Sequence, residues 1–375
     1  MPDRPIRVLH LVESRDTSGF FRQLARFADR SRFEVSVATL KPIDAGFAEA
    51  LRSDGVPHFS LGCASRISYP LGLLRLALRL RGRAIDVLHT HLFDPSVVGL
   101  AAGRLARTRT RVLTRHYSDY HTRIDKSLHV RLDRIATRLS HAVIAVSSHT
   151  AEHLVLAEGA PRPKVRTILN GVDFARLAAS PPEVLTRLRA ELAADGEPLL
   201  LMPARLHPEK GHTFLFQALE QLGEAAPLVL LAGDGPFRRA YEAEVAARGI
   251  QAHVRFLGFR QDLPDLMSLA DGVVLPSVAE AFGLVLVEAL YLGTPVVATR
   301  VGGVSEIVTD GVDGLLVPPG DAAALALAMR RLGGEPGLRS RLAGAGRARM
   351  EGSFDFRAML RAYEALYLEL LAAHA

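Results

Sequence analysis

Residues that cross-link or anchor a protein are scarce in this chain. It contains one cysteine, Cys63, and no tryptophan among 375 residues. A single cysteine cannot form an intrachain disulfide, so we expect a protein of a reducing compartment in which Cys63 is a small buried apolar residue. No run of about 20 apolar residues is present, so no transmembrane helix is expected. Residues 1–14 carry a short apolar run between charges and no cleavage pattern, which predicts a cytoplasmic protein without a secretory signal.

Acidic residues are few in the first half of the chain. Residues 1–170 hold 27 Lys and Arg against 15 Asp and Glu, a net charge of +12, whereas residues 171–375 hold 19 against 25, a net charge of −6. A basic half suggests an anionic lipid surface or a phosphorylated acceptor as partner. No nucleic-acid-binding motif accompanies the charge, so we expect no nucleic acid partner. A genomic preference for arginine would explain the same excess without any function.

The rest of the composition is that of an ordinary globular protein, with 49% hydrophobic and 23% charged residues, and the length favours two domains. Apolar runs suited to buried strands alternate with helical patterns in both halves, which predicts two α/β domains with doubly wound, mostly parallel sheets. The runs are 6–12, 33–40, 86–91, 110–116, 142–147, 199–206, 228–236 (which ends in a glycine turn), 254–259, 272–276 and 296–299. A domain boundary is expected between about 170 and 182. Residues 310–321 are predicted as a loop, followed by helices at 321–333, 335–350 and 354–371.

The stretch 276–303 contains two glutamates, Glu280 and Glu288, with seven residues between them. Glu280 falls in a turn after a strand, and a helical run from Leu284 to Leu292 follows. Glu288 then lies about one turn inside that helix, ~6 Å further along the axis at ~1.5 Å per residue. Backbone N–H groups at the helix start would lie between the two carboxylates; they belong to Phe282, Gly283 and Leu284. Such a site suits a ligand that is anionic in the middle and has hydroxyls at both ends, as a nucleotide sugar has.

This stretch, E-A-F-G-L-V-L-V-E-A-L, resembles the Glu-x7-Glu signature of the retaining glycosyltransferases of family 4. Its flanks agree with that family at ARLHPEKG (204–211), LVLLAGDGP (228–236), VRFLGF (254–259) and GGVSEIVTDGVDGLLVPPGD (302–321). The resemblance implies a GT-B fold, in which two Rossmann-like domains face an interdomain cleft. It assigns residues 1–170 to an acceptor-side domain and residues 171–354 to a nucleotide-sugar-binding domain. The C-terminal helix, 355–375, would pack back on the first domain.

The resemblance also implies a reaction. A hexose would pass from a nucleotide sugar, a UDP- or GDP-sugar, to the hydroxyl of a glycolipid or polysaccharide precursor, with no cofactor. Attack on the same face would keep the anomeric configuration, and the departing phosphate would take the acceptor proton. The chain contains no Asp-x-Asp motif, which fits a metal-independent enzyme in which Arg205 and Lys210, in R-x4-K spacing, replace the cation.

Particular residues take roles by that resemblance. Glu280 would contact the transferred sugar, and Glu288 would bind the ribose hydroxyls. The expected catalytic residues are Glu280, Arg205, Lys210 and His116. The expected donor-binding residues are Gly19, Arg205, Lys210, Gly258, Phe259, Glu280, Ala281, Phe282, Gly283, Leu284 and Glu288.

The first half offers candidates for the acceptor side. Gly19 separates the first strand from a helical pattern, as in phosphate-binding loops, although the family usually has two glycines where this chain has Ser18 and Gly19. His91 and His116 each end a predicted strand, where ligands of such sheets bind. By the resemblance, His116 contacts the sugar or the acceptor, and His91 and Asp119 are further acceptor-side candidates. A lone histidine is otherwise most often a structural residue.

Two segments could contact a membrane. Residues 120–140 carry an apolar stripe at spacings of four and three with arginines mostly off it, and residues 69–84 are similar. The stripe consists of Ile124, Leu128, Leu132, Ile135 and Leu139. Either the stripe faces the protein core and the basic face is solvated, or the helix contacts anionic lipid head groups at the inner membrane face.

Other functions fit the same scaffold. A sugar-nucleotide epimerase or a phosphorylase would use a similar site, and a two-domain sugar-binding protein would close on a ligand without catalysis. The last is disfavoured because such proteins are typically exported. The sequence does not specify the sugar, the nucleotide, the acceptor or the oligomeric state.

Overall fold

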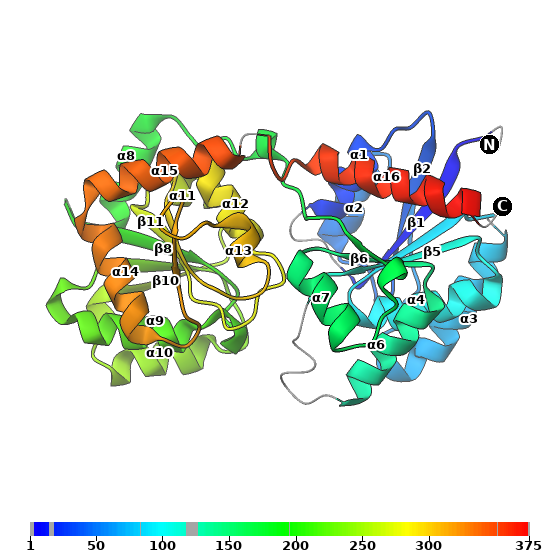
Figure 1. The fold of residues 1–375 in the computed structure, drawn as a ribbon, viewed down its shortest axis with the longest axis horizontal. Helices are drawn as coiled ribbons and strands as arrows, with labels where there is room; N and C mark the ends of the chain where they lie inside the picture. Colours follow the sequence, from blue (N-terminus) through cyan, green and yellow to red (C-terminus); the bar gives the residue numbers. More distant parts are fainter. Residues whose placement is uncertain are drawn as a thin grey trace. The chain divides into compact units, whose positions relative to one another are not determined.

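The computed structural model describes residues 4–14, 19–82, 84–117, 127–194, 196–350 and 352–373. The chain divides into two compact units, each built on its own parallel sheet (Figure 1). The first unit consists of Met1–Leu169 and Arg357–Ala375, and the second of Asn170–Phe356. The end of the chain therefore belongs to the same unit as its beginning. Asp119, singled out from the sequence, lies outside the described residues.

The first sheet has seven parallel strands in the order β3-β2-β1-β4-β5-β6-β7. They are β1 (Ile6–Val12), β2 (Phe33–Thr39), β3 (His58–Ser60), β4 (Val87–His91), β5 (Thr110–Arg115), β6 (Ala142–Ala145) and β7 (Val165–Thr167). The helices are α1 (Phe20–Phe27), α2 (Ala45–Ser53), α3 (Tyr69–Gly82), α4 (Phe93–Ala106), α6 (Ser127–Leu139), α7 (Ser148–Leu156) and α16 (Phe356–Ala373), with 3-10 turns at Arg66–Ser68 and Arg162–Lys164. The strands run outward from β1 in both directions, which is the doubly wound order.

The two faces of this sheet differ in chemistry. Because side chains alternate along a strand, Leu9 and Leu11 of β1 lie on one face and His10 lies on the other. The leucine face packs on α3 and α4 in a cluster that also contains the buried Cys63, as predicted. The histidine face packs on α1 and α16, which lie on the opposite side of the sheet from α3 and α4 (Figure 1).

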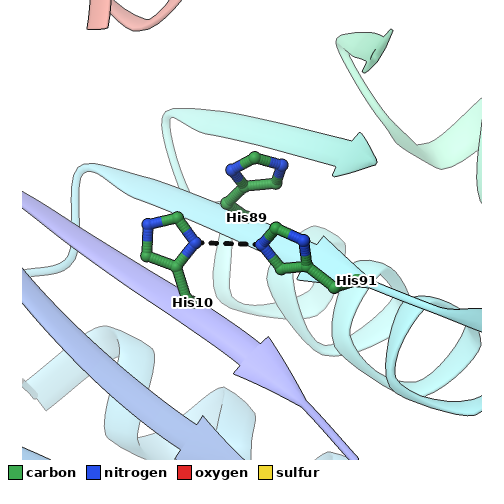
Figure 2. Close-up of side chains that lie close together, drawn as sticks. All are labelled: His10, His89 and His91. Carbon is green, nitrogen blue, oxygen red and sulfur yellow. Dashed lines mark hydrogen bonds between the residues drawn. The ribbon is translucent and has the colours of Figure 1, made fainter. Parts of the chain in front are cut away.

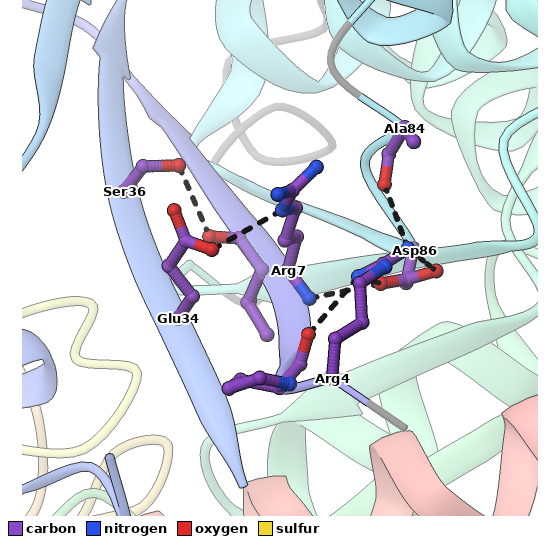
Figure 3. A network of polar contacts seen from close by, with 8 residues as sticks. Arg4, Arg7, Glu34, Ser36, Ala84 and Asp86 are labelled. Carbon is purple, nitrogen blue, oxygen red and sulfur yellow. Dashed lines mark hydrogen bonds and ion pairs between the residues drawn. The ribbon is translucent and has the colours of Figure 1, made fainter. Parts of the chain in front are cut away.

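A polar network closes the other end of β1 (Figure 3). The Arg4 guanidinium donates to the Asp86 carboxylate at 2.8 Å, and the backbone N–H of Arg7 donates to the same carboxylate at 2.9 Å. The Arg7 side chain pairs with Glu34 of β2 at 3.1 Å. Asp86 is 5% exposed, and it immediately precedes β4, so the network fixes β4 against β1 at their amino ends. The carboxyl ends, where the histidines lie, are thereby held in register.

The second sheet has six parallel strands in the order β10-β9-β8-β11-β12-β13. They are β8 (Leu199–Pro203), β9 (Leu228–Ala232), β10 (Val254–Gly258), β11 (Gly272–Leu275), β12 (Val296–Thr299) and β13 (Leu315–Val317). The helices are α8 (Pro182–Leu192), α9 (His212–Leu222), α10 (Arg238–Ala247), α11 (Leu263–Leu269), α12 (Leu284–Tyr291), α13 (Val304–Ile307), α14 (Ala322–Gly334) and α15 (Pro336–Met350). The 3-10 turns are Phe174–Arg176, Pro208–Lys210, Gly223–Ala225 and Gln251–His253.

The prediction of a loop at 310–321 is wrong in its middle. Leu315–Val317 forms β13, the edge strand beside β12, with Val297 opposite Leu315 and Thr299 opposite Val317. Three apolar residues between a glycine and a proline are too few to show a strand period. Hydrogen bonding to β12, which the sequence does not reveal, makes them a strand.

The apolar stripe, for which the sequence leaves a core-facing and a lipid-facing role open, is divided in the described part of α6: Leu139 packs against the core and Leu132 is half-buried, whereas the other two members are exposed. The buried residues of α6 are Asp133, Ala136 and Thr137. Leu128 and Ile135 are 63% and 46% exposed. Asp133 turns inward because it pairs with the buried Arg115 at 2.8 Å, and that contact decides which face of the helix is covered. Within the described parts of the chain, every helix is too short or too polar to cross a bilayer.

Candidate functional site

The loop between β11 and α12 carries the first glutamate of the pair. One oxygen of Glu280, Oε2, accepts a hydrogen bond from Nζ of Lys210 at 2.6 Å and one from the Ser277 hydroxyl at 3.3 Å. The side chains of Glu280 and Lys210 are 14% and 22% exposed. The pair is therefore shielded from most water but still open to a ligand. Lys210 comes from the loop after β8, so the ion pair joins two loops at the carboxyl edge of the second sheet.

Close backbone packing holds these loops together. A β-carbon on Gly211, which follows Lys210, would lie 1.9 Å from the carbonyl oxygen of Pro276. A β-carbon on Gly302, after β12, would lie 1.5 Å from the carbonyl oxygen of Glu280. Any side chain at either position would push apart the loops that carry the lysine and the carboxylate. The two glycines thus keep Lys210 and Glu280 within contact distance.

Glu288 lies on α12, one turn past the helix start, as the sequence predicts for that helix. The side chain is half-buried. Burial raises the pKa of Glu288 to about 7, and the positive charge of Arg176 offsets part of that effect. Near neutral pH this carboxyl therefore exists in both the protonated and the ionised form. A carboxyl with a raised pKa, on the helix that follows the Glu280 loop, is a candidate for ligand binding.

Arg205 has different surroundings from Lys210. Its side chain is 61% exposed, and its guanidinium lies 3.8 Å from the Glu209 carboxylate. In the described part of the chain, that is its one ion pair. The R-x4-K spacing therefore gives a lysine held against Glu280 and an arginine at the surface of the same loop.

The other predicted donor-binding residues of the second unit differ in their exposure to solvent. Gly258 ends β10, and Phe259 after it is 67% exposed. Phe282 is 2% exposed, and its ring packs against Phe354 with 5.6 Å between ring centroids. The ring of Phe282 is therefore part of the core, and only its backbone remains for a ligand. Ala281 and Leu284 are half-buried and Gly283 is buried.

Four histidines gather on the first sheet: His10 and His89 lie within β1 and β4, His91 ends β4, and His116 directly follows β5. Figure 2 shows His10 on β1 and His91 on β4 with ring nitrogens facing each other, and His89 beside them. His10 Nδ1 lies 2.9 Å from His91 Nε2, and His91 Nδ1 lies 3.0 Å from His116 Nε2. His91 is 0% exposed, so it lies behind His116, which is half-buried. The structure brings the two predicted histidines into contact and adds His10 and His89, which the sequence analysis missed.

His89 has partners outside this contact. Its Nδ1 lies 2.6 Å from the Tyr367 hydroxyl of α16, and its Nε2 lies 2.6 Å from the Thr114 hydroxyl of β5. Burial lowers the pKa of His10 to about 3 and that of His116 to about 4. Burial also lowers the pKa of His89 and of His91 well below the ordinary value. All four rings are therefore neutral at pH 7.

Two further features fix the position of His116. The preceding residue, Arg115, is 1% exposed, and it pairs with Asp133 at 2.8 Å and with Glu158 at 3.2 Å. On the other side, the ring of Phe20 meets the His116 ring edge-on at 5.9 Å between centroids. Phe20 begins α1 directly after Gly19, so the predicted phosphate-binding turn and His116 are neighbours.

Comparison with known proteins identifies the family. The model of glycosyl transferases group 1 matches residues 186–349, and the model of glycosyltransferase family 4 matches residues 19–176. A D-inositol 3-phosphate glycosyltransferase from Frankia alni is 32% identical over 352 residues, which cover 87% of this chain and 84% of that protein. The chain belongs to glycosyltransferase family 4. The resemblance inferred from 276–303 and its flanks is thereby confirmed at the level of the family.

Other relatives of this family 4 glycosyltransferase match over shorter lengths. The 2-deoxystreptamine glucosyltransferase of Streptomyces kanamyceticus is 33% identical over 57% of each chain, and the alpha-D-kanosaminyltransferase of the same organism is 30% identical over 62% of each. The match thus spans less than two thirds of those two relatives. Anabaena HepE in complex with UDP-glucose is 27% identical, with a TM-score of 0.81, over 98% of this chain and 100% of that one. The predicted GT-B fold is confirmed.

Proposed function

We propose that this family 4 glycosyltransferase takes its sugar from a nucleotide sugar, a UDP- or GDP-sugar, and transfers it with retention to the hydroxyl of a glycolipid or polysaccharide precursor. The main observation in favour is the ion pair of Lys210 and Glu280. A diphosphate needs a cation and a sugar needs a hydroxyl-binding carboxylate, and this pair supplies both groups 2.6 Å apart. HepE, whose structures contain UDP and UDP-glucose, is similar to this chain over nearly its whole length.

The charges of the second unit suggest how the donor is held. The diphosphate competes with Glu280 for the Lys210 ammonium, because both are anions at short range. Lys210 then binds the phosphates, and Glu280 is released to accept hydrogen bonds from the sugar hydroxyls. The exposed Arg205 adds a second positive charge to the diphosphate, and Glu288 accepts hydrogen bonds from the ribose hydroxyls.

The transfer step needs no carboxylate nucleophile, unlike that of the usual retaining glycosidases. The acceptor oxygen forms a bond to the anomeric carbon on the face from which the phosphate oxygen departs. The electron pair of the broken bond goes to the diphosphate, and the acceptor proton goes to the departing phosphate oxygen. Lys210 and Arg205 stabilise the negative charge that develops there, so we propose a metal-independent reaction.

A donor screen tests this proposal. UDP- and GDP-sugars are expected to raise the melting temperature, and the right donor at 100 times its Kd adds about 2.7 kcal/mol of stability. The same donor should support transfer to a hydroxyl acceptor in the presence of EDTA, with the product anomer matching the donor anomer by NMR. An inverted product, or activity that EDTA abolishes and Mg²⁺ restores, would contradict it. Conversion of the donor without any acceptor would indicate an epimerase.

The acceptor side points to a membrane of anionic lipid. Leu71, Leu74 and Leu78 are 51%, 53% and 69% exposed, at spacings that put them on one side of α3, and Ile67 in the 3-10 turn before the helix is 93% exposed. The neighbouring exposed residues include Arg75 and Arg79. On α6 the exposed Leu128 and Ile135 are likewise interspersed with arginines, and both helices pack on α4. We assign this apolar and basic surface to contact with lipid, at which the enzyme binds its acceptor.

A single substitution tests whether the exposed leucines of α3 contact lipid or are simply exposed to water. Leu74→Ser is expected to lower the partition into vesicles that contain phosphatidylglycerol by about tenfold, since one buried leucine contributes about 1.5–3 kcal/mol. The matched control is Leu327→Ser on α14 of the second unit, because Leu327 is 51% exposed. Equal effects of the two substitutions, or equal binding to purely phosphatidylcholine vesicles, would refute the lipid assignment.

A further inference from the structure

His10, His91 and His116 form an unbroken chain of three imidazoles that ends at the half-buried His116. The two links are His10 Nδ1 to His91 Nε2 at 2.9 Å and His91 Nδ1 to His116 Nε2 at 3.0 Å. Both are hydrogen-bond distances. The chain uses Nδ1 of His10, both nitrogens of His91, and Nε2 of His116. The nitrogen of His116 that the chain does not use is Nδ1.

Elementary chemistry couples the three rings. A neutral imidazole carries one N–H and one lone pair, and a hydrogen bond needs one of each. If His10 is protonated on Nδ1, then His91 must be protonated on Nδ1 to donate to His116, which is then protonated on Nδ1 as well. If His116 donates through Nε2, the same reasoning places every proton on Nε2. The chain of three histidines therefore has two states, one with all protons on Nδ1 and one with all protons on Nε2.

The surroundings keep the chain neutral and ordered. His10 is 2% exposed and His91 is 0% exposed, and the pKa values given above lie far below 7. The rings of Phe20 and Phe21 pack edge-on against His91 at 6.2 and 4.8 Å between centroids. No charged form competes at neutral pH, so the two tautomeric states are the ones that matter.

We propose that His10 and His91 are positioning residues: their tautomers are coupled through this chain to that of His116, and the shared state of the three rings sets whether Nδ1 of His116 donates or accepts a hydrogen bond toward the acceptor substrate. The inference deepens the proposed function and rests on it for the identity of that substrate. An acceptor hydroxyl has a proton to donate, so the productive state is the one with all three protons on Nε2. His116 Nδ1 then presents a lone pair that orients the attacking oxygen.

A metal site made of His10, His89 and His91 is the rival explanation, because ligand atoms of these residues lie within 4.8 Å of one another. Each nitrogen of His91 already faces another histidine at 2.9 or 3.0 Å. Each nitrogen of His89 already faces a hydroxyl at 2.6 Å. A metal ion would need lone pairs that these contacts use, so the hydrogen-bonded chain accounts for the geometry better.

Nitrogen-15 NMR of protein labelled at histidine tests the coupling without any substrate. The protonated and unprotonated ring nitrogens are distinguished in two-bond spectra, and each histidine is assigned by substitution. We expect His10, His91 and His116 of the wild-type protein to be neutral at pH 7 and all protonated on Nε2. Mixed tautomers among the three, the Nδ1–H state, a charged ring, or stoichiometric zinc binding that shifts all three signals would overturn the proposal.

Variants connect the tautomer to catalysis. His10→Leu removes the first partner, and we expect the tautomers of His91 and His116 to mix and kcat/KM for the acceptor to fall about tenfold with the donor KM unchanged. His10→Asn, whose amide can contact His91 where Nδ1 of His10 did, should restore both the shared tautomer and kcat/KM.

Tyr367→Phe removes a hydroxyl that contacts His89 and should leave the tautomers of the three histidines and the kinetics unchanged. Kinetic loss without a tautomer change would refute the positioning role, whereas coupled tautomers in a protein that transfers no sugar would refute only the proposed function.

Discussion

Replacing Lys210 by alanine is expected to lower kcat for sugar transfer by about 100- to 1000-fold at saturating donor. That is the range for losing one group that stabilises charge developing in a transition state. The measurement is turnover with the donor found by the screen, under conditions where donor binding is saturated. Lys210→Arg keeps the positive charge but replaces the compact ammonium with a planar guanidinium. Its kcat should therefore lie between that of the alanine variant and that of the wild type.

Arg248→Ala is the matched control for this experiment. Arg248 is 23% exposed, close to the 22% of Lys210, and its guanidinium lies 2.6 Å from Glu220, the same distance as in the Lys210 pair. It lies in the same unit, directly after α10. The control should transfer sugar at the wild-type rate.

Combining Lys210→Ala with Glu280→Gln removes the unpaired carboxylate, so if the double variant regains full turnover, Lys210 serves only to neutralise Glu280.

Replacing Glu288 by glutamine is expected to weaken donor binding about 10- to 100-fold at pH 8. A hydrogen bond to a charged group contributes about 1.5–3 kcal/mol, and the amide offers only a neutral acceptor. The wild-type donor KM should fall as the pH rises through about 7, because ionisation of Glu288 creates the acceptor that the ribose hydroxyls need. The KM of Glu288→Gln should be flat over the same range. A wild-type KM that does not change between pH 6 and pH 8 would rule out this role.

The same substitution has a predicted effect on stability. The folded pKa of Glu288, about 7, lies above its ordinary value of 4.5, so the folded state binds the proton more tightly than the unfolded state. The wild type should therefore lose stability as the pH rises from about 4.5 to 7, by roughly 3 kcal/mol at ~1.4 kcal/mol per unit. Glu288→Gln should lack that loss. Denaturant titrations at pH 5 and pH 8, with Glu242→Gln on α10 as control, measure the difference.

The central stretch was largely predictable because its signals are local. The helix was expected from Leu284 to Leu292 and is found at Leu284–Tyr291, and the strand expected at 296–299 is β12. Glycine before the helix and Thr294-Pro295 after it define both ends within a few residues. Family membership followed from the same residues, since a short motif and its flanks are read without knowing any long-range contact.

The histidine chain could not be predicted in the same way. His91 and His116 were found because each ends a strand, whereas His10 lies inside the apolar run 6–12 and His89 inside the run 86–91. A histidine within a buried strand carries no local signal of function. Only the parallel register, which places His10 beside His89, brings β1 and β4 together and reveals the cluster.

By itself, the sequence determined the α/β class, most of the strands and helices, the family, and the two glutamates beside a helix start, because these depend on periodicity, glycine and proline positions and motif spacing along the chain. The tertiary structure alone decided which charges and rings meet. The approach of two loops at Gly211 and Gly302 put Lys210 against Glu280, and Arg115 decided which face of α6 is buried. Strand register joined His10, His91 and His116. Such contacts depend on how distant segments pack, and no pattern within one segment encodes that packing.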